Sequence, residues 1–185
     1  MLFLASKSPR RRELLGQLGI PFEVLAVNID ETWGGGGDIN DFIVTLALDK
    51  ARAGKQLVQP GDAVLAADTE VIIDDQVLGK PRDAQHAVEM LQRLSGRAHR
   101  VLSAIAVIGA EERTALNISR VSFKSLTPEE CRRYCATGEP LDKAGAYAIQ
   151  GRAAAFITRL QGSYSGVMGL PLFETGQLLR NAVIT

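Results

Sequence analysis

The chain has little of several things that would point to other classes of protein. Only two of its 185 residues are cysteine and only 5% are aromatic, and its 21 basic residues are balanced by 21 acidic ones. Few cysteines exclude a disulfide-rich secreted domain, and a neutral chain poor in aromatics does not favour nucleic-acid binding. No apolar run approaches the roughly 20 residues that span a bilayer, and Lys7 and Arg10 come too early for a signal peptide. We therefore expect a cytoplasmic protein that binds neither nucleic acid nor membrane.

Familiar nucleotide and metal motifs are absent too. The sequence has no G-x-x-x-x-G-K-[ST] phosphate loop, no G-x-G-x-x-G after a strand and no H-E-x-x-H. Cys131 and Cys135 have no histidine nearby in the sequence to complete a zinc site, so we expect two reduced structural thiols. His86 and His99 are isolated from each other, and neither is given a catalytic role.

Hydrophobic periodicity and turn residues predict alternating strands and helices, which indicates an α/β fold. Strands are expected at residues 1–5, 22–27, 64–67, 71–73, 76–78, 100–108 and 115–123, and helices at 9–18, 41–56, 83–94, 128–136 and 171–181. Residues 162–169 are expected to form a loop. No repeat or linker divides the chain, so a single domain over residues 1–185 is predicted.

Basic side chains crowd into the start of the first predicted helix. A serine and a proline at 8–9 suit the N-cap and first turn, and three arginines follow at 10–12. Cations beside the positive end of a helix dipole are unfavourable alone, but an anion reverses that penalty. We expect bound phosphate here, whereas Arg12 more readily extends into solvent or pairs with a nearby carboxylate. The expected phosphate ligands are Ser6, Ser8, Arg10 and Arg11.

A carboxylate at the end of the predicted strand 64–67 is the second feature. Proteins of the α/β class place site residues at strand ends, so Asp68 could be a general base or a metal ligand, although such an aspartate is often only a turn or cap residue. Glu31, Lys50 and Lys80 suit Mg²⁺ and released phosphate, yet each also suits a solvated surface. Spacing along the sequence does not show whether these side chains converge.

A series of segments, in matching order and spacing, resembles the Maf family of nucleotide pyrophosphatases. They are L-A-S-K-S-P-R-R at 4–11, A-D-T at 67–69, G-K-P at 79–81, L-S-G at 94–96, E-P-L-D-K-A-G-A-Y at 139–147, I-Q-G at 149–151, G-S-Y at 162–164 and G-L-P-L at 169–172. The resemblance covers nearly the whole chain. It implies a mixed, twisted sheet flanked by helices, with two lobes around a central substrate cleft, similar to inosine triphosphatases.

The resemblance also implies an activity. Members of the family are house-cleaning hydrolases that cleave a nucleoside triphosphate between its α- and β-phosphates, with a divalent cation such as Mg²⁺ or Mn²⁺. A small-molecule nucleotide as substrate and a homodimer are implied as well. By motif, Asp68 would accept the proton of the attacking water and would bind the metal together with Glu31. Arg11, Lys50 and Lys80 would line the site of the phosphates.

Three positions, Arg10, Thr69 and Gln150, resemble the branch of the family that acts on dTTP and UTP; the branch that acts on 7-methyl-GTP differs at the last two. The amide of Gln150 offers a donor and an acceptor that match the N3–H and carbonyl edge of thymine or uracil. The glycine run at 34–37 departs from the family pattern, which leaves loop closure and substrate range open. Two alternatives stay open: a pyrophosphatase for another nucleotide such as 7-methyl-GTP, and a non-catalytic nucleotide-binding regulator of cell division, which would not need Asp68 as a base.

Overall fold

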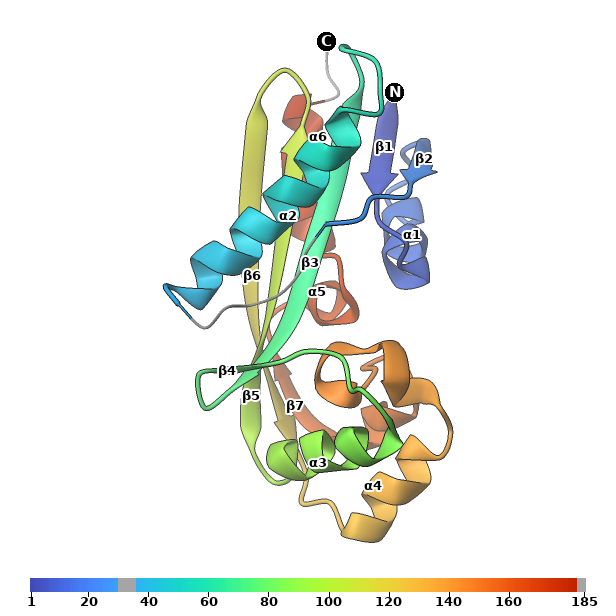
Figure 1. Ribbon diagram of the computed structural model, residues 1–185, viewed down its shortest axis with the longest axis vertical. Helices are drawn as coiled ribbons and strands as arrows, with labels where there is room; N and C mark the ends of the chain where they lie inside the picture. The colour runs from blue at the N-terminus through green and yellow to red at the C-terminus, as the bar shows by residue number, and fades with distance from the viewer. Residues whose placement is uncertain (30–35, 183–185) are drawn as a thin grey trace. The chain divides into compact units, whose positions relative to one another are not determined.

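The computed structural model describes residues 1–29 and 36–182 (Figure 1). Its strands are β1 (Leu2–Ala5), β2 (Phe22–Leu25), β3 (Ala63–Ile73), β4 (Gln76–Leu78), β5 (Ala98–Ile108), β6 (Glu112–Phe123) and β7 (Ile157–Gln161). Its α-helices are α1 (Pro9–Gly16), α2 (Ile39–Lys55), α3 (Ala84–Leu94), α4 (Pro128–Cys135), α5 (Tyr164–Met168) and α6 (Leu172–Ala182), and its 3-10 turns are η1 (Glu139–Asp142), η2 (Ala144–Ala146) and η3 (Arg152–Phe156).

The strands of the described residues form one seven-stranded mixed sheet in the order β2-β1-β3-β5-β6-β7, with β4 beside β3. Strand β1 is parallel to both of its neighbours, β2 and β3, whereas β4 and β7 run antiparallel to β3 and β6. The predicted class, a mixed α/β sheet flanked by helices, is confirmed.

The chain divides into two compact units. Unit 1 holds residues 1–69, 103–117 and those from 169 onward, and unit 2 holds residues 70–102 and 118–168. In unit 1, α2 and α6 cover opposite faces of the strands (Figure 1). In unit 2, α3 packs against α4 and against the turns η1 and η2.

The contact of α2 with the sheet is unusually close. The buried positions of the helix recur every three or four residues and include Ile43, Leu46, Lys50 and Gly54. A β-carbon placed on Gly54 would lie 2.9 Å from Val64 of β3 and 3.1 Å from Ala5 of β1. Glycine at this position therefore lets the helix backbone approach the sheet.

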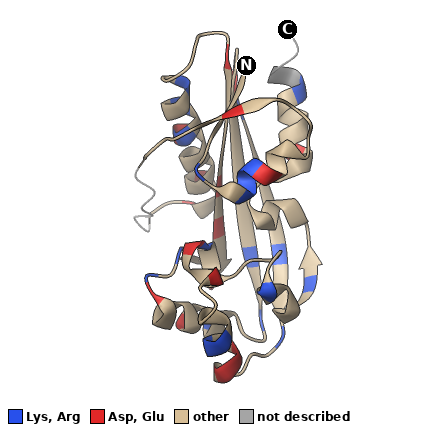
Figure 2. Cartoon of the chain, turned by 90° about the vertical axis from the view of Figure 1, so that its right-hand side faces the viewer, with Lys and Arg blue, Asp and Glu red and all other residues tan. Residues whose placement is uncertain are grey.

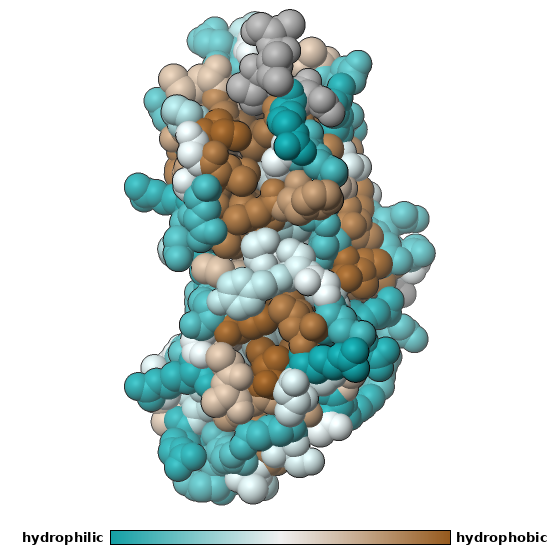
Figure 3. Space-filling model, turned by 180° about the vertical axis from the view of Figure 1, so that it is seen from behind, coloured by the Kyte–Doolittle hydropathy of each residue, from teal (hydrophilic) through white to brown (hydrophobic). Residues whose placement is uncertain are grey.

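Hydrophobic side chains fill the interior of both units. Leu4, Leu65 and Leu102 are fully buried, and among the described residues only a few large apolar side chains, such as Phe173, are well exposed. On the face shown in Figure 3, hydrophobic residues reach the surface in patches bordered by hydrophilic ones. No helix in residues 1–29 and 36–182 is both long enough and apolar enough to cross a membrane.

The prediction of two short strands at 64–67 and 71–73 was wrong. The structure has a single strand, β3, which runs through Asp68 from Ala63 to Ile73. A charged residue does not end this strand because Lys50 from α2 bonds the carboxylate inside the protein. Asp68 therefore lies in mid-strand, where burial restricts its access to bulk water.

Two other segments differ from expectation. The expected loop at 162–169 contains the short helix α5, whose Gly166 N–H donates to the Ser163 hydroxyl at 2.9 Å. Strand β7 was not predicted; it pairs with β6, for example Leu160 with Val121.

Three local features of the structure fit the residue types found there. Asp74 and Asp75 both have positive φ angles in the tight turn between β3 and β4. Thr127 and Glu130 form a capping box at the start of α4. Cys131 and Cys135 on that helix are free and buried, and burial raises the pKa of the Cys135 thiol to about 11, consistent with inert structural thiols.

Unit 2 buries a histidine that the sequence left without a role. His99 is 2% exposed, and its Nε2 lies 2.8 Å from the Tyr147 hydroxyl. The rings of Phe123 and Tyr147 contact it edge-on, with centroids 5.1 and 5.4 Å away. Burial lowers the pKa of His99 to about 4, so the imidazole is neutral in the folded protein at pH 7.

We expect this histidine to make the protein sensitive to acid. The unfolded chain takes up the proton near pH 6.5, whereas the folded protein resists it until about pH 4, so stability falls as the pH drops between those values. A difference of this size corresponds to about 3 kcal/mol of unfolding free energy. Urea unfolding at pH 7 and pH 4.5 measures it: His99→Gln should flatten the dependence, and His86→Gln, on the partly exposed histidine of α3, should not. Equal pH slopes in all three proteins would contradict the assignment.

Candidate active site

A buried ion pair joins two of the predicted site residues. Asp68 points from the middle of β3 and Lys50 from α2, and the Lys50 Nζ lies 2.6 Å from Asp68 Oδ1. The Lys50 side chain is only 8% exposed and the Asp68 side chain only 6%. Such a short, charge-assisted hydrogen bond holds the carboxylate in one orientation. The surface interpretation of Lys50 is therefore wrong.

The second oxygen of this carboxylate differs from the first. Asp68 Oδ2 is buried and has no hydrogen-bond partner among the residues that the structure describes. Buried polar atoms are almost always bonded, and an exception calls for an explanation such as a catalytic role or a place for a water or an ion. Asp68 Oδ2 can therefore accept a proton from a water molecule or contact a cation.

The same carboxylate has the chemistry of a metal ligand. Mg²⁺ prefers oxygen ligands and is often held by one or two carboxylates, with waters and substrate phosphates completing its shell. Asp68 Oδ2 fits one such position. Within residues 1–29 and 36–182, no group of three or more histidine, cysteine or acidic side chains is placed to hold a metal ion. Glu31, the second predicted ligand, lies outside the described residues.

The start of α1 is shaped by the two predicted serines. Ser8 is the N-cap, and its Oγ accepts from the Arg11 backbone N–H at 3.5 Å. The Ser6 Oγ in turn accepts from the Ser8 N–H at 3.2 Å. These bonds fix the turn from β1 into the helix and bring Ser6, Ser8 and the partly exposed Arg10 to the helix N-terminus. The turn thus places two hydroxyl groups and one guanidinium at the start of α1.

Arg11 is anchored within unit 1. Its Nε donates to the Gly169 carbonyl at 2.9 Å and its Nη2 to the Thr69 hydroxyl at 3.3 Å. Thr69 follows Asp68 on β3, and its hydroxyl lies 2.9 Å from that of Ser103 on β5. Arg11 is thus held beside the residue next to Asp68.

Ser103 and Gly169 were not predicted as part of this network. Ser103 lies within an apolar strand, where its pattern suggests only a small buried residue. Gly169 has a φ of +131°, which favours glycine, and a β-carbon there would lie 3.7 Å from the Arg11 side chain. Its place in the G-L-P-L segment was the only sequence signal for it.

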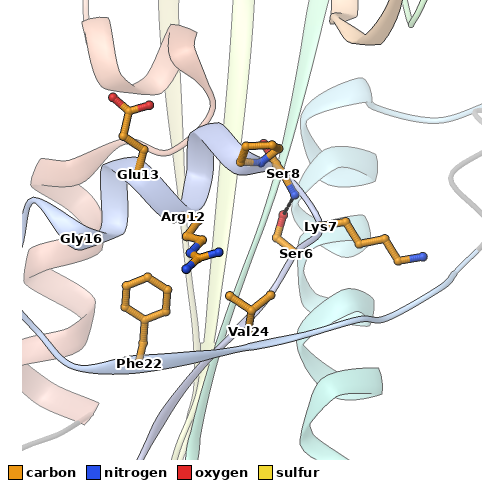
Figure 4. A pocket seen from close by; sticks show the side chains of 9 residues that line it. Ser6, Lys7, Ser8, Arg12, Glu13, Gly16, Phe22 and Val24 are labelled. Carbon is orange, nitrogen blue, oxygen red and sulfur yellow. Dashed lines mark hydrogen bonds between the residues drawn. The ribbon is translucent and has the colours of Figure 1, made fainter.

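A pocket of about 500 Å³ lies between α1 and β2 (Figure 4). Arg12 points from the helix toward Phe22 and Val24 of the strand, and Glu13 points away from them. Its lining residues are Ser6, Lys7, Ser8, Pro9, Arg12, Glu13, Gly16, Phe22 and Val24. The pocket thus combines cations and hydroxyls with an apolar wall.

The remaining predicted residues belong to unit 2. Lys80 follows β4 and is exposed. Gln150 is also exposed and lies in a turn closed by the Gly151 N–H, which donates to the Ala148 carbonyl at 3.1 Å. Figure 2 shows both acidic and basic residues on the helices.

Comparisons with known proteins agree with this description. The family model described as "Maf-like protein" matches residues 1–182. The chain is 55% identical over 181 residues to the dTTP/UTP pyrophosphatase of Methylococcus capsulatus, and this alignment covers 97% of this chain and 90% of the relative. It is 51% identical over 183 residues to that of Alkalilimnicola ehrlichii, covering 96% and 91%.

A solved structure supports the fold. The HAM1 protein of Coxiella burnetii superposes with a TM-score of 0.54 at 18% identity, covering 98% of each chain. At that identity the likeness concerns the fold alone. The family model and the two curated relatives together establish the family: this chain belongs to the Maf family.

Proposed function

We propose that the protein hydrolyses dTTP and UTP to the nucleoside monophosphate and pyrophosphate. The observation that carries the proposal is the buried carboxylate of Asp68, oriented through one oxygen by Lys50 and with a second oxygen that no described donor bonds. This arrangement suits a general base. The similarity to relatives named dTTP/UTP pyrophosphatase supports the choice of substrates.

In the proposed reaction, the oxygen of a water molecule attacks the α-phosphorus. Asp68 Oδ2 accepts the proton from that water, and the bond between the α-phosphorus and the bridging oxygen to the β-phosphate breaks. The leaving group is pyrophosphate. Lys50 keeps the carboxylate turned so that Oδ2 faces the water, and no covalent enzyme intermediate is required.

The cations and hydroxyls around α1 are proposed to bind the phosphates. Arg11 is held in place by Gly169 and Thr69, so little side-chain entropy is lost when it binds an anion. Ser6, Ser8 and Arg10 add donors at a helix N-terminus, which is a ready anion site. We assign Lys80 the same role toward the leaving pyrophosphate.

A divalent cation, Mg²⁺ or Mn²⁺, is proposed to be held by Asp68 and Glu31. Such a cation neutralises charge on the triphosphate and on the leaving pyrophosphate. We further propose that the protein works as a homodimer in the cytoplasm, as the resemblance and the composition predict.

The proposal is tested by pyrophosphate release from dTTP, UTP, CTP, GTP, ATP and 7-methyl-GTP, each with Mg²⁺, Mn²⁺ or a chelator. Metal-dependent turnover of dTTP and UTP ahead of the others is expected. A preference for 7-methyl-GTP would support pyrophosphatase activity but reject dTTP and UTP as the substrates. Tight nucleotide binding without turnover would favour the regulator of cell division instead.

Gln150 is expected to select the pyrimidine base. Gln150→Ala removes the amide that would pair with the base edge, so the preference for dTTP and UTP over purine triphosphates should narrow about 10-fold. The ratio of kcat/KM for dTTP and ATP measures this effect. Gln161→Ala, at an exposed glutamine of β7, is the matched control and should leave the ratio unchanged. An unaltered ratio in Gln150→Ala would reject this role.

A further inference from the structure

The turn that carries Gln150 is held from both sides. Gln150 is exposed and lies outside regular secondary structure, between Ala148 and Gly151 of the turn. An unsupported turn of this kind would sample several conformations, and binding would then have to order it. The backbone on either side of Gln150 is instead bonded to two side chains from outside the turn.

The first of these side chains is Tyr134 of α4, which is 4% exposed. Its hydroxyl accepts from the Ala148 N–H at 3.3 Å, two residues before Gln150. It also donates to Glu139 Oε1 at 2.8 Å. Burial and the neighbouring carboxylate raise the pKa of Tyr134 far above its usual value, so the phenol keeps the proton that it donates.

The second side chain is Glu139 of η1, which is half-buried. Its two carboxylate oxygens accept from the Arg152 N–H at 3.1 and 3.2 Å, two residues after Gln150. One carboxylate thus joins the tyrosine on one flank of the turn to the backbone on the other flank.

Gly151 makes room for this carboxylate. A β-carbon on Gly151 would lie 2.2 Å from Glu139 Oε1 and 2.7 Å from Oε2. The backbone there has a φ of −104°, which any residue adopts, so glycine is needed for space and not for conformation. The carboxylate occupies the volume that a side chain at 151 would fill.

We propose that Tyr134 and Glu139 are positioning residues that fix the turn carrying Gln150 and thereby set its discrimination between bases. Neither residue is assigned contact with the nucleotide; both act through the backbone of the turn. The inference rests on the proposed function, because it takes Gln150 as the residue that reads the base.

Tyr134→Phe tests the proposal with little change of volume. Loss of the hydroxyl should raise KM for dTTP and UTP about 10-fold, as expected when one positioning bond worth roughly 1.4 kcal/mol is lost. The value of kcat should change less than about 2-fold, and KM for ATP should stay the same, because the reacting groups are in unit 1 and purines gain nothing from Gln150. Tyr164→Phe, at an exposed tyrosine, is the matched control.

A double-mutant cycle separates positioning from loss of contact. Gly151→Ala alone should raise KM for dTTP about as much as Glu139→Ala, because its new methyl group collides with the carboxylate. In the Glu139→Ala background the collision is gone, so Gly151→Ala should add less than about 2-fold. Simple multiplication of the two single effects would overturn the proposal.

Hydrogen exchange supplies a readout that does not depend on turnover. The amides of residues 148 and 152 should exchange faster in Tyr134→Phe and in Glu139→Ala than in the wild type. Suppose that the wild type is active and that KM for dTTP and KM for ATP rise together in the variants. The two side chains would then have a merely structural role, and the proposal would be rejected. If the wild type hydrolyses no nucleotide, the proposed function fails and base selection fails with it, while faster exchange at 148 and 152 would still show that the two side chains hold the turn.

Discussion

Asp68→Asn is expected to lower kcat for dTTP hydrolysis by about 1,000-fold, a typical contribution of a general base. The amide has the same shape and keeps an oxygen for Lys50, but it cannot accept the proton of the attacking water. Nucleotide affinity, measured by calorimetry, should change little because the arginines and serines of α1 are untouched. The two measurements together distinguish loss of chemistry from loss of binding.

The matched control is Asp49→Asn on α2. This variant makes the same chemical change at a carboxylate that is 49% exposed and lies 3.5 Å from Arg52 on the same helix. Its activity and thermal stability should stay close to those of the wild type. An Asp68→Asn variant that turns over dTTP as fast as this control would remove Asp68 from the mechanism.

Lys50→Met is expected to lower both the stability of the fold and the activity. The substitution keeps most of the side-chain volume but leaves the Asp68 carboxylate buried without its cation, which typically costs about 3 to 5 kcal/mol. The remaining carboxylate also loses the bond that orients it, so kcat should fall. Urea unfolding at pH 7 measures the first effect and pyrophosphate release the second.

Two further variants show whether that result comes from the buried pair. The double variant Lys50→Met, Asp68→Leu replaces the pair by apolar groups of similar shape, and it should recover most of the lost stability without any activity. Arg132→Met breaks an exposed pair with Glu129 on the same helix and should change stability little. If Lys50→Met proved no more harmful than Arg132→Met, the buried pair would not be an important element of the site.

The fold was largely predictable because most of its elements have local signals. The capping box of Thr127 and Glu130 is a local signal for the start of α4. Two consecutive aspartates are a local signal for the hairpin between β3 and β4. Strand β3 was predicted in two pieces because a charged residue at 68 interrupts an apolar run. What makes that charge compatible with a buried strand is Lys50, 18 residues earlier, and no local pattern records such a partner.

The candidate site follows the same division. The pattern of charged residues identified the basic turn at α1 and drew attention to Asp68 and Lys50, and the resemblance added Thr69 and Gln150. The network of Arg11 with Gly169 could not be predicted, because it joins residues 158 positions apart through a backbone carbonyl. The bonds of Tyr134 and Glu139 to the turn are hidden for the same reason: their partners are backbone N–H groups, which every residue except proline carries.

The close contact of Gly54 with the sheet also bears on how this enzyme can change during evolution. Gly54 lies one helical turn after Lys50, so the distance that lets its backbone approach Val64 is also the distance over which the lysine reaches Asp68. A larger residue at 54 would push the helix outward and draw the ammonium away from the carboxylate without altering either group. The Lys50–Asp68 pair therefore depends on a small residue at 54, so we expect few substitutions to be tolerated at a position that carries no functional group.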